Sequence, residues 1–213
     1  MTARSPIEEI QAFKKLNLGC GVSFYKDYLN VNYWENLPPG VIHNPNGTDG
    51  TVLLNWDLRA GIPIADASVD VVYHSHFLEH LDYTEGVAML KEIHRVLVPG
   101  GVHRILVPDL KKWVNAYLNN DLLIQEYRKS GVQVKELSYP TACTVLMGMV
   151  HGHHHKFIWD FETLEHYLRE TGFRFIEETM YQQSCIAEIK DIELYEPLRA
   201  LESLCVECKR IGA

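Results

Sequence analysis

The sequence has no long apolar run, no surplus of positive charge and no regular set of cysteines. No apolar stretch approaches the roughly 18–20 residues that a membrane-spanning helix needs. The opening residues, MTARSPIEEIQAF, contain no apolar core of a signal peptide. Five scattered cysteines do not form the framework of a secreted disulfide protein. We therefore expect a soluble, cytoplasmic protein with no membrane span.

The charge balance narrows the range of partners. The chain has 213 residues, with 28 acidic and 20 basic side chains, and a formal net charge of −8. Proteins that bind DNA or RNA need clustered Lys and Arg to neutralise phosphates, so we expect no nucleic-acid partner. Cys205 and Cys208 form a C-x-x-C, but residues three apart on a strand point to opposite faces, and no second pair completes a zinc site.

Short, almost continuously apolar segments are typical of strands buried on both faces of a parallel sheet. Five segments have this character: 16–18, 28–33, 51–54, 69–73 and 102–107. FRFIEETMY (173–181) and SLCVECKR (203–210) are predicted as two more strands. The segment EGVAMLKEIHRVL is a clear helix, because Val87, Leu90, Ile93 and Leu97 recur at helical spacing, and we expect Pro99-Gly100-Gly101 to end it. Asp160 is expected to cap a second clear helix that ends near Gly172. The pattern predicts an α/β protein.

Residues 1–213 read as a single domain with one insertion, since no internal repeat or Gly/Ser linker interrupts them. After Pro108 the pattern changes, and we expect residues 110–160 to form a helical and loop insertion. Within it, YPTACTVLMGMV is rich in Met and small residues. Such a stretch is compatible with a lid over an apolar substrate, with core packing, or with a contact in a homodimer.

The stretch KKLNLGCGVS places two glycines directly after the first predicted strand. Ligands of open parallel sheets bind beyond the carboxyl ends of the strands, where this turn lies. A G-x-G alone is equally compatible with a plain tight turn. A dinucleotide fingerprint needs a third glycine, where this chain has Phe24, and no Lys-Ser/Thr follows to make a phosphate-binding P-loop. The spacing thus disfavours a nicotinamide-dependent oxidoreductase.

Several motifs follow one another from Leu16 to Leu110. They read LNLGCG, YLNVNYW, NWDLRAGIPIADASVDVVYHSHFLEHL and EIHRVLVPGGVHRILVPDL. In order and separation they resemble the class I S-adenosylmethionine-dependent methyltransferases, in the small subgroup similar to methyltransferase type 11. HKFIWDFETLEHYLRETGF and ESLCVECKR extend the resemblance towards the C-terminus. It implies a doubly wound, mostly parallel, seven-stranded sheet of the Rossmann-like methyltransferase fold, and S-adenosyl-L-methionine as cofactor.

The resemblance assigns cofactor-binding roles to residues at the strand ends. Gly19, Cys20 and Gly21 match the turn whose backbone lies against the methionine part of the cofactor. Asn32 stands where the family usually has an acid that binds both ribose hydroxyls. An amide cannot match a charge-assisted carboxylate pair, so we expect cofactor binding to be weaker by about 1–2 kcal/mol. This departure keeps open the alternative of a catalytically degenerate regulator or scaffold that binds the cofactor or S-adenosylhomocysteine without turnover.

Further cofactor-binding roles follow from the next two motifs. Asp57 and Leu58 match the pair that borders the adenine, with Asp57 accepting from its exocyclic amine. His74, Ser75 and His76 follow the fourth predicted strand, where the family lines the methionine and methyl region. The resemblance leaves the acceptor undefined. Because the negative charge of the chain disfavours RNA and DNA, we expect a small molecule, a sugar or a lipid-linked intermediate.

Methyl transfer to a hydroxyl needs a general base, for which histidine is well suited. In YHSHFLEHL, His76 is the better candidate, because His80 and Glu79 fit a structural role under the cofactor loop. His76 and His80 would share a face of an emerging helix. The tract from His151 to His155 lies inside the chain, so it is no purification tag, and we take His155 as the second candidate base. No carboxylate or cysteine lies at a ligand spacing from this tract, so we expect no metal.

Overall fold

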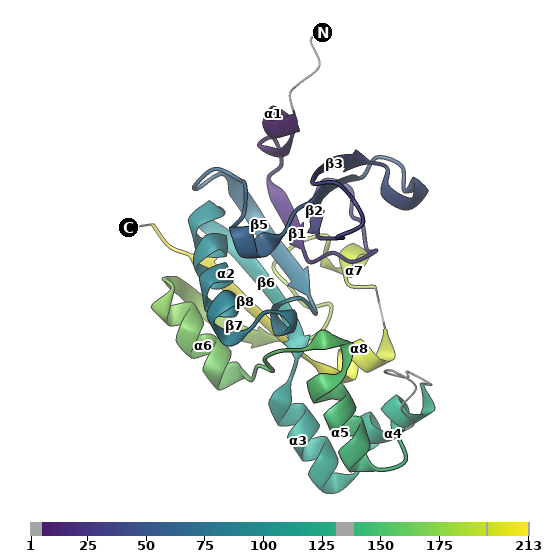
Figure 1. Ribbon diagram of the computed structural model, residues 1–213. Helices are drawn as coiled ribbons and strands as arrows, with labels where there is room; N and C mark the ends of the chain where they lie inside the picture. Colours follow the sequence, from purple (N-terminus) through teal and green to yellow (C-terminus); the bar gives the residue numbers. More distant parts are fainter. Residues whose placement is uncertain (1–5, 131–138, 195, 213) are drawn as a thin grey trace.

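The fold is built on one eight-stranded sheet, in a computed structural model that describes residues 6–130, 139–194 and 196–212. The strands lie in the order β3-β4-β2-β1-β5-β6-β8-β7 (Figure 1). Their bounds are β1 Lys15–Leu18, β2 Leu29–Asn32, β3 Gly40–His43, β4 Val52–Asn55, β5 Val69–Ser75, β6 Leu97–Pro108, β7 Phe173–Thr179 and β8 Ser203–Arg210. The five adjacent strands β4, β2, β1, β5 and β6 run parallel to one another. Strand β3 pairs antiparallel with β4, and β8 pairs antiparallel with both β6 and β7.

All seven strands expected from the sequence form, and the sheet gains an eighth. This strand, β3, pairs antiparallel with β4 at the edge of the sheet. It is half-exposed along its length, so its sequence lacks the continuous apolar character that marks the buried strands. The additional strand leaves the mostly parallel, doubly wound architecture unchanged.

The helices confirm one boundary expected from the sequence and correct another. Their bounds are α1 Pro6–Ile10, α2 Tyr83–Val96, α3 Leu110–Asn119, α4 Leu122–Lys129, α5 Ala142–His151, α6 Phe161–Glu170, α7 Ile189–Ile192 and α8 Pro197–Glu202, with 3-10 turns η1 Pro45–Gly47, η2 Leu58–Ala60, η3 Leu78–His80 and η4 Gly152–His154. Asp160 caps α6 as expected. The expected stop of α2 at Pro99-Gly100-Gly101 is wrong, because α2 ends at Val96 and β6 already begins at Leu97.

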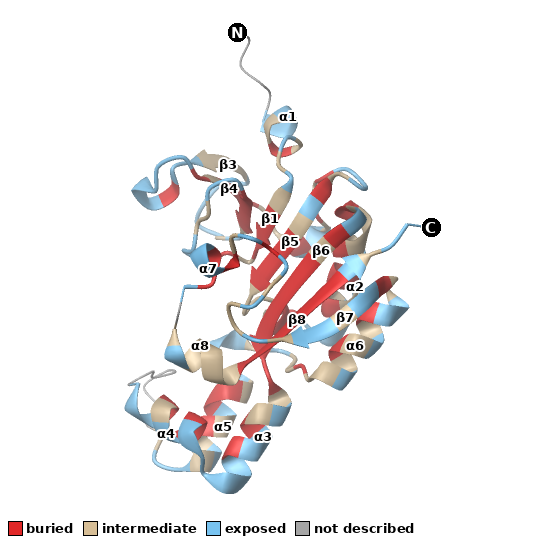
Figure 2. Ribbon diagram, turned by 180° about the vertical axis from the view of Figure 1, so that it is seen from behind, coloured by how far each residue is buried: buried red, intermediate tan, exposed pale blue. Residues whose placement is uncertain are grey.

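Two apolar layers enclose the sheet. One face packs against α2 and α6, and this larger core contains Leu90, Ile93 and Leu164 (Figure 2). The opposite face packs against α7 and the loop before it, through Ile189 and Ile192. No helix connects β1 to β2 in the described chain, so this short C-terminal helix covers the face that a crossover helix would otherwise cover.

The cysteine pair on β8 divides between these two layers. Cys205 packs in the α7 layer and Cys208 in the α2 layer, which confirms that they point to opposite faces of the sheet. A third apolar cluster joins α3, α4 and α5, which project beyond one end of the sheet (Figure 1). Of the expected 110–160 insertion, residues 131–138 lie outside the described residues. No described helix is long and apolar enough to span a bilayer.

Two histidines lie fully buried between β5, β6 and the α2 layer. The rings of His74 and His103 are 5.1 Å apart, and neither ring nitrogen of either residue has a hydrogen-bond partner among the described residues. Burial lowers the pKa of His74 to about 3 and that of His103 well below its usual value, so both rings are neutral in the fold.

This pair predicts a loss of stability in mild acid. Unfolding returns both pKa values to about 6.5, so below that pH the unfolded state binds more protons than the folded state. The contribution of the pair is therefore complete above pH 6.5 and is lost as the pH falls below that value, by up to about 1.4 kcal/mol per pH unit for each ring. Replacing His103 with Leu should flatten the pH dependence of the free energy of unfolding, measured by urea denaturation. An unchanged slope, equal to that of an exposed control such as His151→Leu, would contradict this assignment.

Candidate functional site

The carboxyl ends of the parallel strands meet at one edge of the sheet. The register pairs Leu18 with Val31 on one side and with His74 on the other. Asn32, the last residue of β2, and Gly19 and His76, which follow β1 and β5, therefore lie at the same edge. This arrangement is the usual position of a ligand site in an open α/β sheet.

The glycine turn after β1 has a conformation that favours glycine. Gly19 and Gly21 have φ angles of 61° and 50°, and a Cβ on Gly19 would collide with the ring of Phe77. A Cβ on Gly21 would instead meet nothing within 4 Å, and Gly21 lines two of the pockets described below. The two glycines thus have different functions, because the first allows Phe77 to pack and the second leaves room for a ligand.

Buried amides fix the path of this turn. The Nδ2 of Asn17 donates to the carbonyl of Ser23 and to Oδ1 of Asn30, both at 2.9 Å. The backbone N–H of Cys20 donates to the carbonyl of Val31 at 3.1 Å. Burial raises the pKa of the Cys20 thiol to about 12, so this cysteine is no thiolate nucleophile at neutral pH.

Three pockets meet at this edge, and His76 borders all of them. The first, of about 510 Å³, lies between the glycine turn, the end of β5 and the C-terminal segment. The second, of about 380 Å³, lies beside Asn32 and Asp57, and it shares Gly19 and Gly21 with the first. The third, of about 650 Å³, lies between η3, η4 and α8. His76 has a φ of 51°, a left-handed conformation that is uncommon for non-glycine residues and that recurs at functional sites.

The second pocket contains the residues expected at the ribose and adenine. Asn32 accepts a hydrogen bond at Oδ1 from the backbone N–H of Gly21, at 3.3 Å. Leu58 is buried in its wall. Asp57 caps η2 and pairs with the guanidinium of Arg59 at 2.6 Å, and this hydrogen bond lowers the pKa of the Asp57 carboxyl. The pocket therefore presents an ionised carboxylate and an amide on one rim.

The side chains of His74, Ser75 and His76, at the end of β5, do not all point to the same face of the sheet. Ser75 and His76 line the first pocket, and Ser75 Oγ accepts from the guanidinium of Arg199 at 3.4 Å. His74 instead lies on the opposite face of the sheet beside His103 and is not among the residues that line the three pockets. Strand alternation explains the difference, because neighbouring residues on β5 point to opposite faces.

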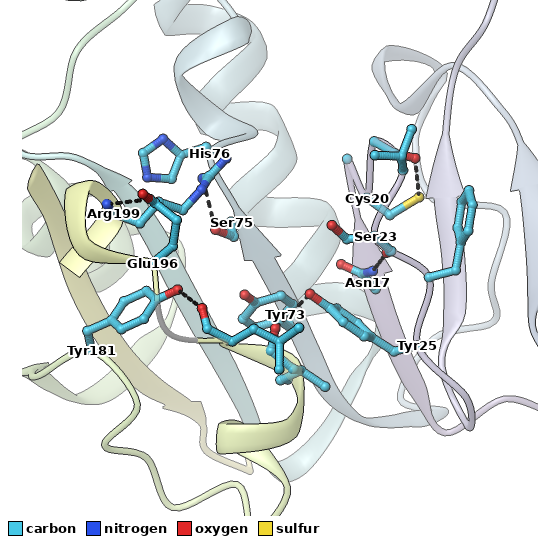
Figure 3. Close-up of a pocket in the computed structure, with 16 residues that line it drawn as sticks. Asn17, Cys20, Ser23, Tyr25, Tyr73, Ser75, His76, Tyr181, Glu196 and Arg199 are labelled. Carbon is cyan, nitrogen blue, oxygen red and sulfur yellow. Dashed lines mark hydrogen bonds between the residues drawn. The ribbon is translucent and has the colours of Figure 1, made fainter. Parts of the chain in front are cut away.

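The far wall of the first pocket comes from the C-terminal third of the chain. Figure 3 shows Tyr181, Glu196 and Arg199 facing Asn17 and Tyr25 across the opening. Sequence reasoning missed these C-terminal residues. These residues belong to no recognisable sequence motif, and only contacts between distant segments of the chain bring them to the strand ends.

A buried ion pair holds this wall in place. Arg104 on β6 donates to both carboxylate oxygens of Glu193, at 2.8 and 2.9 Å, and both side chains are fully buried. Glu193 lies between Ile192 and Leu194, which line the first pocket. Two parallel, charge-assisted hydrogen bonds therefore fix the segment that closes the pocket.

The third pocket contains a cluster of titratable groups around Glu79. The Oε1 of Glu79 lies 3.4 Å from Nδ1 of His76 and 4.0 Å from Nε2 of His155. The His76 Nε2 is 2.9 Å from the hydroxyl of Ser203. Burial raises the pKa of Glu79 to about 8, lowers that of His155 to about 4, and lowers that of His76 well below its usual value. Both imidazoles are therefore neutral at pH 7.

The expected helical face shared by His76 and His80 does not form. Only the short turn η3 spans Leu78–His80, and His76 precedes it in a left-handed conformation. His80 instead packs edge-to-face against the ring of His155, with centroids 5.1 Å apart. The folded chain thus joins His80 to the distant tract that contains His155.

Comparison with known proteins agrees with this geometry. Residues 16–105 match the model of a family described as "Methyltransferase domain". No curated protein matches the sequence. A SAM-dependent methyltransferase from Archaeoglobus fulgidus is 18% identical, with a TM-score of 0.50 over 96% of this chain and 89% of that chain. A chain of the complex between the Haloferax volcanii Trm112 methyltransferase activator and a methyltransferase is 14% identical, with a TM-score of 0.55 over 98% and 87%.

A third structure, a SAM-dependent methyltransferase from Thermotoga maritima, is 16% identical, with a TM-score of 0.51 over 92% of this chain and 82% of that chain. At these identities the structural likeness concerns the fold, while the family model concerns the segment from β1 to β6 that carries the glycine turn and η3. Residues 16–105 therefore resemble the methyltransferase-domain family, and the chain shares its fold with these SAM-dependent methyltransferase structures.

Proposed function

We propose that this chain binds S-adenosyl-L-methionine in the first two pockets and methylates an acceptor held in the third. The observation that carries the proposal is the position of His76, which borders all three pockets. A cofactor bound along the glycine turn would bring its reactive end to this residue, and an acceptor in the third pocket would meet it there. The five free thiols fit a cytoplasmic location, where thiols stay reduced.

The residues at the rim fit such a cofactor. The open space beside Gly21 accepts the methionine part, and the backbone of the Gly19–Cys20–Gly21 turn lies along it. Asn32 would bind the ribose hydroxyls. Asp57 would accept from the adenine amine beside Leu58. When bound, the sulfonium of the cofactor supplies an activated methyl group, and Ser75 and His76 lie where they can orient the groups around it.

The third pocket suits an acceptor with a hydroxyl group. Arg199 and Glu196 provide polar contacts, and Tyr127 and Met149 provide apolar ones. His76 is placed to take the hydroxyl proton at Nδ1 while the Ser203 hydroxyl orients Nε2. His155 is the second imidazole that lines this pocket. Small molecules, sugars and lipid-linked intermediates all present such hydroxyls.

The insertion after β6 contributes the outer wall of this acceptor pocket. Tyr127 on α4 and Met149 on α5 belong to the apolar cluster of α3, α4 and α5, and both also line the pocket. We propose that residues 110–160 act as a substrate lid. Met147 on α5 is 40% exposed, which leaves room for a contact with a second copy of the chain.

The first test is calorimetric titration of the purified chain with S-adenosylmethionine and, separately, with S-adenosylhomocysteine. Saturable one-site binding of both ligands would support the proposal, and a screen of hydroxyl acceptors with isotopically labelled cofactor would follow. Binding without transfer to any acceptor would favour the degenerate regulator. Absence of binding at millimolar ligand would refute the proposed cofactor site.

Gly21 provides a sharp test of the cofactor position. We expect Gly21→Val to abolish binding of S-adenosylhomocysteine, because the new side chain would fill the open space beside the turn. Gly47→Val is the matched control, since Gly47 also has a positive φ, of 76°, and open space around its Cβ, but lies outside the three pockets. The control should lose a similar amount of stability, about 1–2 kcal/mol, and keep full affinity in the same titration. Equal loss of binding in both variants would contradict the assignment.

Asn32 provides a test with the opposite sign. Asn32→Asp keeps an acceptor for the Gly21 N–H and adds a charge that two ribose hydroxyls can share. We expect affinity for S-adenosylhomocysteine to rise by about 1–2 kcal/mol, or roughly 5- to 30-fold. Asn44→Asp, a change of the same kind at an exposed residue whose Oδ1 also accepts from a backbone N–H but which lies outside the three pockets, should bring no gain. A weaker or unchanged affinity of Asn32→Asp would place the ribose elsewhere.

A further inference from the structure

Glu79, His80 and His155 bring three metal-ligand atoms together beside the acceptor pocket. One carboxylate oxygen and one ring nitrogen from each histidine lie within 4.8 Å of one another. The three residues come from η3 and from the segment after η4, and all three line the third pocket. Spacing along the chain hides this group, because the carboxylate meets the histidine tract only in the folded protein.

The carboxylate of Glu79 lacks the partners that a buried carboxylate normally has. Its side chain is fully buried, and neither oxygen has a hydrogen-bond partner among the described residues. Without a charged partner, a fully buried carboxyl keeps its proton. A divalent cation bound beside it would displace that proton and stabilise the carboxylate.

The orientation of His155 is that of a metal ligand. Its Nδ1 lies 2.6 Å from the carbonyl of Met149, so Nδ1 carries the proton and Nε2 presents its lone pair towards Glu79. Metal-binding histidines almost always have their second nitrogen held in this way. The loop itself is fixed, because the carbonyl of Glu79 accepts from the backbone N–H groups of Lys156 and Phe157, at 2.8 and 3.3 Å.

We propose that Glu79, His80 and His155 bind one divalent transition-metal ion of the Zn²⁺ type. Two imidazoles and one carboxylate form the donor set of many catalytic zinc sites, which keep a further position open for water or substrate. Ligand atoms around tetrahedral Zn²⁺ lie about 3.4 Å apart. The group therefore needs only a contraction by side-chain rotation to close around the ion.

The ion defines the kind of acceptor, an inference that rests on the proposed methyl transfer. All three ligands line the pocket that His76 borders, so an acceptor oxygen bound there could complete the coordination of the ion. Coordination to a divalent cation lowers the pKa of a bound hydroxyl, so the oxygen becomes a nucleophile at neutral pH. The proton then passes to His76, and His155 serves as a ligand rather than as a base. The site selects an alcohol, including a vicinal diol of a sugar, over an amine or a carbon acceptor.

The test is metal binding by the full chain after treatment with a chelator. We expect calorimetry with Zn²⁺ to show one site with a Kd of about 1 µM or tighter. Glu79→Gln and His155→Gln should each weaken binding at least about 10-fold. Co²⁺ should give the visible absorption of a tetrahedral nitrogen and oxygen site. The matched control is His151→Gln, which removes an exposed histidine of the same tract that does not line the third pocket, and it should leave the Kd unchanged.

Two results would overturn the metal site. One is no Zn²⁺ binding by the unmodified chain. The other is equal loss in the His151→Gln control, which would indicate surface chelation by the tract. Thermal unfolding and titration with S-adenosylhomocysteine accompany every variant, so that a folding defect is recognised as such. Cofactor binding without metal binding would refute this inference alone, whereas metal binding without cofactor binding would refute the proposed function and leave the metal site standing.

Discussion

The parallel pairing of the central strands is the constraint on which the site depends. Because β1, β2, β4 and β5 run the same way and in register, the residues after each strand come together at a single edge. The glycine turn, Asn32, Asp57 and His76 are far apart along the chain, and no local interaction would bring them together. Every pocket in the proposed mechanism opens along this edge, so the chemistry follows from the hydrogen-bonding direction of the sheet.

The sequence predicted correctly those structural elements that depend on local residue patterns. Apolar strands, the Asp160 cap and the glycine turn each have a signature a few residues long, and each lies where it was expected. The edge strand β3 was not predicted, because half-exposed strands lack a continuous apolar run. The wall made by Arg199, and the meeting of Glu79 with His155, depend on contacts between distant segments. No spacing rule in a single sequence reveals such contacts.

Two buried carboxylates illustrate how structural and functional charges differ. Glu193 is as buried as Glu79, yet both of its oxygens accept from the guanidinium of Arg104. That carboxylate is compensated inside the fold and acts as an anchor for the pocket wall. Glu79 has no comparable cation among the residues that the structure describes, and it lines a pocket together with His155. The contrast separates a carboxylate that the chain compensates by itself from a carboxyl group that stays protonated until a cation binds.

Because no crossover helix follows β1 in the described part of the chain, the sheet face beside β1 and β2 is covered only after the segment that contains α7 has been synthesised. Lys15, at the start of β1, pairs with Glu188, and the α7 layer covers the face beside β1 and β2. Strand β8 also lies between β6 and β7, so β7 joins the sheet only through residues near the C-terminus. A nascent chain that ends before residue 203 would expose an unpaired edge of β6 and an incomplete binding edge. Folding on the ribosome must therefore wait for the last strand, a period in which the open sheet is vulnerable to aggregation.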